Sequence, residues 1–267
     1  MSSDQNILEN LRNELHMHTH LYYVKDAPII SDYEFDLMLK KLTDLELKFP
    51  QFFDINSPSQ RVGGKVSKKF NNIKHDYPMY SLDNSYSKND LDSFYSRILK
   101  KIPDDDLNFL CELKFDGVSI NLTYQNGVLV RAVTRGDGVQ GDDVTENVKT
   151  IKTIPLKLNG DYPQKFQIRG EIFIELNDFN KMNIDRTNNG LEPYMNPRNT
   201  ASGSLKLQDS AEVARRPLKC FLYQVVSEHD ESKTQYENLI SASKWGFNIS
   251  DSYRLCNSID EVFDFIN

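Results

Sequence analysis

Lys114 is the side chain whose surroundings most favour covalent chemistry. It ends an apolar stretch, with Glu112 before it and Asp116 and the turn residue Gly117 after it (residues 111–117, CELKFDG). A lysine attacks only as a neutral amine, and a reference pKa of about 10.4 leaves about one molecule in a few thousand neutral at pH 7. Burial or nearby cations would have to favour the neutral amine, whereas Glu112 and Asp116 oppose it unless other partners occupy them. The alternative interpretation is a strand that ends in a charged turn.

Two later segments contain arginines of the kind that such a lysine needs. Arg135 lies in residues 134–138 (TRGDG), where glycines permit tight turns close to a ligand. Arg169 and Glu171 flank Gly170 inside another apolar stretch. Alternation along a strand could instead place Arg169 and Glu171 on one solvent-exposed face, without any function.

A third segment is typical of an anion-binding helix start. In residues 196–199 (NPRN), Asn196 fits the N-cap and Pro197 the first helical position. The small residues 200–204 (TASGS) follow, and a helix N-terminus beside Arg198 favours an anion such as phosphate. Helix capping explains Asn196 and Pro197, but it does not explain Arg198.

Two other classes of site lack support. There is no GxSxG segment for Ser/His/Asp catalysis, and the three cysteines form neither a CxxC metal pair nor a disulfide framework. His16 and His20 are spaced as neighbours on a helix, with His18 between them, but the HExxH pattern is absent. We therefore expect surface histidines.

The elements that must position these residues fall into two groups. Apolar residues at helical spacing predict helices over 7–22 and from the cap Ser31, which forms a capping box with Glu34, to the stop at Pro50. Residues 50–75 are irregular, and we place a domain boundary there, between residues 68 and 69. The first unit is too small for much core of its own, so we expect it to dock on the rest of the chain.

The second group mixes strands and helices. Asn126-Gly127 predicts a hairpin between strands 118–124 and 128–134. Because hairpins outnumber strand–helix alternations, we expect an α+β fold with mainly antiparallel sheets. Further strands are predicted over 109–113, 166–174 and 220–226, and helices over 91–100, 142–149, 178–185, 233–245 and 258–267, the last capped by Ser258. The chain stops inside an amphipathic helix, which favours truncation.

Composition narrows the class of protein. The chain has 267 residues, 32 Lys plus Arg against 39 Asp plus Glu, a net charge of −7, and 39% apolar and 11% aromatic residues. It is therefore globular, and the acidic balance argues against a protein whose main task is gripping nucleic-acid phosphates, although a local basic groove is compatible with it. We expect no membrane span and no signal peptide, and the widely spread cysteines suit a reducing cytoplasm.

Taken together, these segments resemble one enzyme family. Residues 112–117 (ELKFDG) are similar to the KxDG signature of covalent nucleotidyltransferases, and their order with 81–84 (SLDN), 134–138, 169–171 and 196–205 resembles the adenylation domain of bacterial NAD-dependent DNA ligases. Residues 22–36 (YYVKDAPIISDYEFD) resemble the N-terminal helical domain found only in the NAD-dependent class. The resemblance implies a helical domain over 1–68 and an ATP-grasp-like nucleotidyltransferase domain over 69–267.

The resemblance also implies roles for residues. Lys114 would attack NAD to form lysyl-AMP and release nicotinamide mononucleotide (NMN), and the complete enzyme would pass AMP to a 5′-phosphate at a DNA nick and seal it. Glu112 would read adenine or its adjoining backbone region, and Tyr223 would stack on adenine. Glu171 would hold the ribose or a Mg²⁺ ion. The other implied nucleotide contacts are Ser81, Leu82, Asp116, Arg135 and Arg198 in the adenylation domain, and Tyr22, Tyr23, Asp32 and Asp36 for NMN.

Three departures from the family pattern qualify these expectations. Phe35 replaces a usual Tyr near the nicotinamide side, and Lys206 replaces a usual Arg and loses its bidentate fork. The family also continues with a DGVVxK strand and a further lysine-bearing strand, and this chain stops before both. A separate C-terminal part is therefore a possible partner.

Two alternatives remain open at this point. Because the later lysines are missing, the chain could be an NAD- or NMN-binding module without turnover. An ATP-using nucleotidyltransferase is the weaker alternative, since residues 22–36 speak against it.

Overall fold

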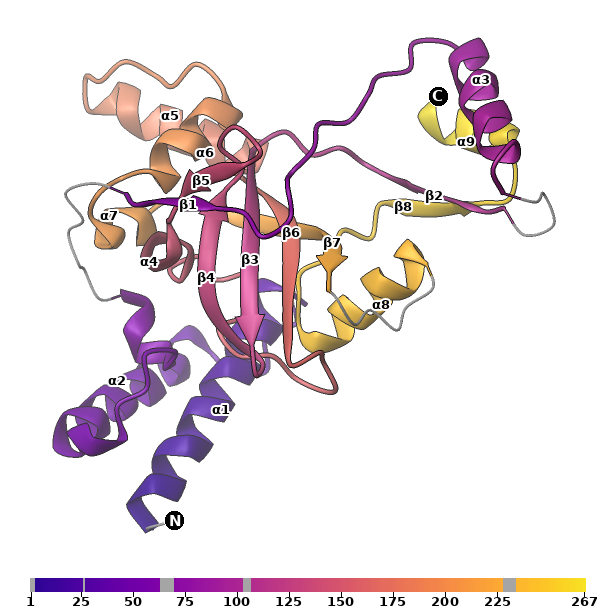
Figure 1. Cartoon of the computed structure of the whole chain (residues 1–267). Helices are drawn as coiled ribbons and strands as arrows, with labels where there is room; N and C mark the ends of the chain where they lie inside the picture. Colours follow the sequence, from indigo (N-terminus) through magenta and orange to yellow (C-terminus); the bar gives the residue numbers. More distant parts are fainter. Residues whose placement is uncertain (1–2, 26, 63–69, 103–106, 228–233) are drawn as a thin grey trace.

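The computed structural model describes residues 3–25, 27–62, 70–102, 107–227 and 234–267. A helical N-terminal unit lies beside a larger unit built around a sheet (Figure 1). The predicted boundary between residues 68 and 69 falls outside the described residues. Among the described residues, no helix combines the length and the apolar character that crossing a membrane requires.

The helical unit consists of α1 (Ser3–Tyr23) and α2 (Asp32–Lys48). Its small core is a leucine cluster on the two helices, to which Phe35 contributes as a partly buried ring. The capping box predicted at Ser31 is confirmed: its hydroxyl accepts from the Glu34 N–H, and the Glu34 carboxylate accepts from the Ser31 N–H. A buried ion pair of 2.7 Å between Arg12 and Glu46 ties α1 to α2.

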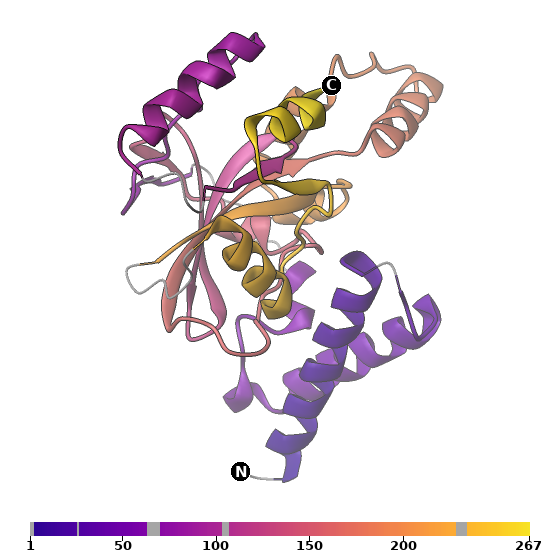
Figure 2. The same cartoon turned by 90° about the vertical axis from the view of Figure 1, so that its right-hand side faces the viewer.

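Two short 3-10 helices, η1 (Pro50–Phe52) and η2 (Pro58–Val62), lead toward the second unit. The buried Arg61 of η2 donates hydrogen bonds of 3.0–3.2 Å to the carbonyls of Lys149, Ile151 and Ile154. Figure 2 shows α1 reaching the C-terminal end of helix α8 (Gln235–Trp245), where His20 hydrogen-bonds the Gly246 backbone. The expected docking of the helical unit is thus made by η2 and one face of α1.

The three α1 histidines are not surface residues, so that expectation was wrong. His18 is buried, and His16 and His20 line a small cavity between α1 and the second unit, together with Arg61 and Lys152. Burial, with the positive charges of Arg61, Lys157 and Arg12, lowers the pKa of His16 to about 3. Helical periodicity alone could not reveal this burial, because the residues that cover α1 lie far along the chain.

The main sheet has the antiparallel order β4-β3-β6-β7, which confirms the α+β prediction. Asn126 and Gly127 both have positive φ values (50° and 74°) at the β3–β4 turn, as the predicted hairpin requires. The strands are β3 (Val118–Gln125), β4 (Val128–Thr134), β6 (Lys165–Phe173) and β7 (Lys219–Val226).

The two faces of this sheet differ sharply in polarity. Ile120 and Leu122 of β3 and Ile168 and Ile172 of β6 point into the core. Residues of α6 (Pro197–Leu205), α7 (Ser210–Ala214), α8 and the 144–158 segment cover them. Because side chains alternate along a strand, Ser119, Asn121, Gln167, Arg169 and Glu171 lie on the opposite face. The polar face is the one that carries the site.

Two small sheets and several helices complete the second unit. Strand β2 (Phe109–Glu112) pairs with β8 (Tyr253–Cys256), and with α3 (Lys88–Leu99) and α9 (Ile259–Ile266) they extend as an arm (Figure 1). Strand β1 (Asn72–Lys74) pairs with β5 (Gln140–Asp142). The other helices are α4 (Thr145–Val148), α5 (Leu176–Asn188), α6 (Pro197–Leu205), α7 (Ser210–Ala214) and α8 (Gln235–Trp245).

Sequence patterns located most of these elements but missed short ones. The caps at Asn196 and Ser258 are confirmed, whereas the helix expected over 142–149 is shorter, since Asp142 belongs to β5. Strands β1, β5 and β8 and helix α7 were not predicted. Lys233, at the start of one expected helix, lies outside the described residues.

Candidate active site

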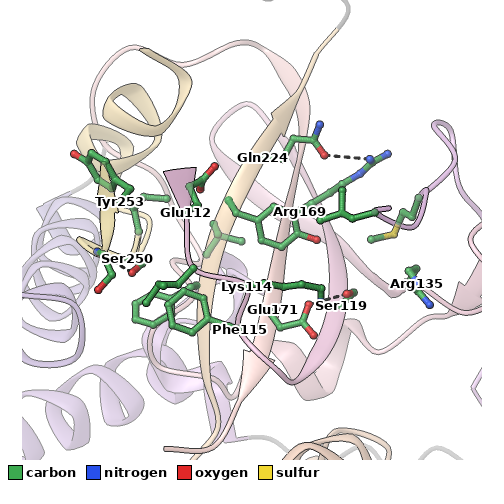
Figure 3. A pocket seen from close by; sticks show the side chains of 18 of the residues that line it. Glu112, Lys114, Phe115, Ser119, Arg135, Arg169, Glu171, Gln224, Ser250 and Tyr253 are labelled. Carbon is green, nitrogen blue, oxygen red and sulfur yellow. Dashed lines mark hydrogen bonds between the residues drawn. The ribbon is translucent and has the colours of Figure 1, made fainter. Parts of the chain in front are cut away.

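A cavity of about 350 Å³ lies between the polar face of the main sheet and the β2–β8 pair. This volume lies within the range of about 300–1,000 Å³ that is usual for small-molecule sites. Figure 3 shows Lys114 between Glu112 on one side and Arg135 on the other. Of the residues predicted from the sequence, the pocket brings together Ser81, Leu82, Glu112, Lys114, Arg135, Glu171 and Tyr223.

The loop that carries Lys114 is fixed on both sides of the lysine. Phe115 packs against Phe221 and Phe173, with ring centroids 4.6 and 5.8 Å away. The Gly117 N–H donates a 3.1 Å hydrogen bond to Glu171 Oε1, and a Cβ at Gly117 would lie 2.1 Å from the Ile172 carbonyl oxygen. Glycine is therefore required at this position by close packing of the backbone against β6, independently of any ligand.

Lys114 itself is exposed in the pocket. Among the described residues, it forms no ion pair within 4 Å of a carboxylate. Its ammonium or amine group is thus available to a ligand in the cavity.

Glu171 is the central carboxylate of the pocket floor. It lies opposite Ser119 in the β3–β6 register and accepts a 2.7 Å hydrogen bond from the Ser119 hydroxyl. Burial raises the pKa of Glu171, and the hydrogen bonds from Ser119 and Gly117 and the charges of Lys114 and Arg198 only partly offset this effect. Burial and the Glu171 charge also raise the pKa of Tyr223, which hydrogen-bonds to Ser119.

Arg169 is buried beneath the pocket. The alternative interpretation, in which strand alternation places Arg169 and Glu171 on a solvent-exposed face, is therefore wrong for Arg169. Its guanidinium donates to the carbonyls of Tyr77 (3.1 Å) and Pro78 (2.9 Å) and to Gln224 Oε1 (3.2 Å). These bonds hold the segment that leads to Met79, Ser81 and Leu82 against the sheet. The residue also lines the cavity.

Arg135 stands at the far edge, at the end of β4. Its backbone N–H donates to the Ser119 carbonyl (3.0 Å), and its own carbonyl lies 3.1 Å from His75 Nε2. The following turn needs its glycines: Gly136 and Gly138 have φ values of 57° and 92°, and a Cβ on Gly138 would lie 2.8 Å from the Met79 carbonyl oxygen.

Glu112 enters the cavity from the small sheet, where it pairs with Tyr253. Burial raises the pKa of Glu112, and a hydrogen bond from Gln235 lowers it in part. Neither Tyr253 nor Gln235 was found by sequence reasoning, because their proximity to Glu112 exists only in the folded chain. Ser119 was also missed, although its place two residues after Gly117 on a strand was a usable signal.

Five of the remaining predicted residues, Asp116, Arg198, Tyr22, Tyr23 and Asp36, do not line the cavity. Asp116 and Arg198 form an ion pair of 3.1 Å beside it. Tyr22 and Tyr23 are exposed at the end of α1, with ring centroids 4.7 Å apart, and Asp36 is exposed on α2. Asp32 begins α2, and its side chain is not among those that the structure describes.

The carboxylates of the pocket do not form a metal cage. In the described part of the chain, no group of three or more His, Cys, Asp or Glu side chains is placed to hold a metal. Of the described residues, Glu171 and Glu112 are the carboxylates that line the cavity. This donor set suits a cation that keeps most of its waters and relies on ligand phosphates, as Mg²⁺ commonly does.

Two family models match the chain. Residues 67–267 match the NAD-dependent DNA ligase adenylation domain, and residues 1–63 match the N-terminal NAD+-binding domain of the DNA ligase-like family. Residues 64–66 separate the two matched ranges.

Curated relatives agree with these models. The chain is 58% identical over 98% of its length to a DNA ligase of Flavobacterium johnsoniae, and 51% identical over 97% to one of Bacteroides fragilis. A DNA ligase of Cytophaga hutchinsonii is 46% identical over 97% of the chain. The chain spans about 39% of the length of each of these relatives.

Proposed function

This chain belongs to the family of NAD-dependent DNA ligases, and we propose that it carries out the first chemical step of that family, the transfer of AMP from NAD+ to Lys114. The observation that carries the proposal is the position of Lys114, exposed in a cavity of about 350 Å³ between Glu112, Arg135 and Glu171. Phosphoryl transfer depends mainly on this kind of positioning and on charge neutralisation.

In the proposed step, the neutral Lys114 Nζ attacks the α-phosphate of NAD+. An N–P bond forms while the P–O bond to NMN breaks, the lysine gives up a proton, and NMN leaves with the electron pair of that bond. The products are a lysyl-AMP phosphoramidate and free NMN. Arg135 and Asp116 contact the ribose and the nearby phosphate, and Arg198 contacts phosphate.

The adenine half occupies the side of the pocket formed by β2 and β7. Glu112 accepts a hydrogen bond from the base, Tyr223 stacks on its ring, and Ser81 and Leu82 line the same space. What supports this assignment is that all four line one cavity although they come from three separate segments of the chain.

Glu171 is the residue that would hold Mg²⁺ through its waters, or else the ribose. Its two oxygens already accept bonds from Gly117 and Ser119, which fixes the carboxylate but leaves lone pairs for a further donor or a hydrated ion. When bound, Mg²⁺ would supply positive charge to the phosphates.

The NMN half is held by Tyr22, Tyr23, Asp32 and Asp36 of the helical unit. Tyr22, Tyr23 and Asp36 do not line the cavity. The helical unit therefore has to approach the pocket when NAD+ is bound. Phe35 has a role in the core of that unit, because it packs on the leucine cluster of α1 and α2.

Nick sealing is proposed for the whole protein, of which this chain corresponds to the N-terminal part. AMP passes from Lys114 to the 5′-phosphate of nicked double-stranded DNA, and the nick is then sealed, in replication and repair. The rest of the ligase is the partner that binds the DNA.

The test is the choice of nucleotide. The chain with NAD+ and Mg²⁺ gains one AMP, whereas ATP gives none, and Tyr22→Ala lowers the rate with NAD+. Saturable NAD+ binding without a covalent product would instead support a binding module. Adenylation by ATP in preference to NAD+ would contradict the proposed cofactor.

A further inference from the structure

Glu112 and Tyr223, the two residues proposed to contact adenine, belong to different sheets. Glu112 ends β2, which pairs only with β8 in the described part of the chain, and Tyr223 lies in β7 at the edge of the main sheet. No strand pairing between described residues fixes the distance between them. Another group has to set it.

The Gln235 side chain makes that connection. Its Nε2 donates to Glu112 Oε2 at 3.3 Å and also to the Tyr223 carbonyl oxygen. A side-chain amide has two N–H donors, and both partners here accept only, so chemistry fixes the orientation of the amide. One NH₂ group therefore spans the two sheets.

Gln235 is itself held firmly. It is the first residue of α8, directly after the Thr234 N-cap, whose capping box with Glu237 is complete. Helix α8 packs on β7 and is anchored by the buried Trp245, whose ring lies 5.1 Å from that of Phe166. Gln235 does not line the cavity, so it can act on a bound ligand only through Glu112 and Tyr223, which do line it.

We propose that Gln235 is a positioning residue that sets base specificity, by holding the Glu112 carboxylate where it accepts a hydrogen bond from the 6-amino group of adenine. This inference rests on the proposed function, and in particular on Glu112 as the reader of the base. Without the donated bond, the half-exposed carboxylate is free to turn toward solvent.

Two substitutions of similar size separate this role from a structural one. Gln235→Glu keeps the shape but replaces the donor with a carboxylate, which repels Glu112. Gln235→Lys retains donors for both acceptors. Lys244→Gln, at an exposed position on the same helix, is the matched control.

The experiment compares NAD+ with nicotinamide hypoxanthine dinucleotide, in which a carbonyl oxygen replaces the 6-amino group. Dissociation constants and rates of Lys114 adenylation are measured at pH 7.5 for all four proteins. We expect the wild type, Gln235→Lys and Lys244→Gln to prefer NAD+ by about tenfold or more, the usual value of a charge-assisted hydrogen bond. Gln235→Glu should lose most of this preference.

The ratio between the two dinucleotides decides the outcome. If Gln235→Glu weakens both equally and keeps the wild-type ratio, Gln235 is merely structural and the proposal is wrong. A wild type that binds both dinucleotides equally would also overturn it. Binding preference without any adenylation would refute the proposed transfer step while supporting the role of Gln235, so the two failures are distinguishable.

Discussion

The Arg198 guanidinium lies 3.1 Å from the carboxylate of Asp116, which follows Lys114 by two positions in the chain. Both side chains are exposed, at 59% and 71%, so the pair contributes at most about 1 kcal/mol to folding. Its importance is electrostatic. Arg198 offsets the negative charge of Asp116 at the edge of a pocket proposed to receive two phosphates.

Arg198→Gln should therefore impair catalysis much more than stability. We expect the rate of Lys114 adenylation to fall by at least about tenfold, because an uncompensated Asp116 repels the phosphates and a phosphate contact is lost. The free energy of unfolding should change by less than about 1 kcal/mol.

A double-mutant cycle with Asp116→Asn tests whether the two residues act together. We expect the double variant to lose less activity than the product of the two single losses. A double variant whose loss equals the product of the two single losses would show that the ion pair has no role of its own.

Gly117→Ala should destabilise the second unit, because its Cβ would lie 2.1 Å from the Ile172 carbonyl oxygen. We expect the free energy of unfolding in denaturant to fall by at least about 2 kcal/mol. Gly203→Ala is the matched control. Apart from its chain neighbours and the backbone of its own helix, no atom of the described residues lies within 4 Å of the added Cβ, and its position inside α6 should make alanine neutral or stabilising by up to about 1 kcal/mol. Equal effects at both glycines would contradict the packing argument.

Ser119→Ala should change the pH dependence of adenylation. The Ser119 hydrogen bond lowers a Glu171 pKa that burial has raised, so its removal raises that pKa further. Since the proposed role needs ionised Glu171, the acidic fall in rate should begin at a higher pH in the variant. Rates measured from pH 5 to 8, with Ser241→Ala as a control outside the pocket, check this shift, and an unmoved acidic limb would argue against it.

His16 should make the folded protein sensitive to acid. Its pKa is about 3 in the folded chain, against 6.5 for an unperturbed histidine, so between these pH values the unfolded chain binds the extra proton. The free energy of unfolding therefore loses nothing to His16 well above pH 6.5. It decreases as the pH falls, by about 2 kcal/mol at pH 5 for this group. His16→Gln should show a smaller loss between pH 7 and 5 in denaturant unfolding. The same loss in both proteins would exclude His16 as the cause.

Local signals predicted the parts of the fold that local chemistry determines. The Asn126-Gly127 turn and the caps at Ser31 and Asn196 each depend on a few neighbouring residues, and all three are confirmed. Alternation along β6 correctly predicted that Arg169 and Glu171 lie on one face. It could not predict which segments cover that face. The 75–82 segment and the β2–β8 pair cover it, and neither was predictable from the strand itself.

Contacts between segments far apart in the chain could not be predicted from the sequence. Strand β8 has only four residues, and it is recognisable as a strand only because it pairs with β2, more than a hundred residues earlier. The Asp116–Arg198 pair, the Gln235 bridge to Glu112 and the burial of the α1 histidines have the same origin.

The most direct test of the central claim is the intact mass of the purified chain after incubation with NAD+ and Mg²⁺, with Lys114→Ala treated in parallel. The proposal predicts a gain of one AMP in the wild type, release of one NMN, and no gain in the folded variant. An AMP adduct that persists in Lys114→Ala, or a folded wild-type chain that binds NAD+ but never gains mass, would contradict it.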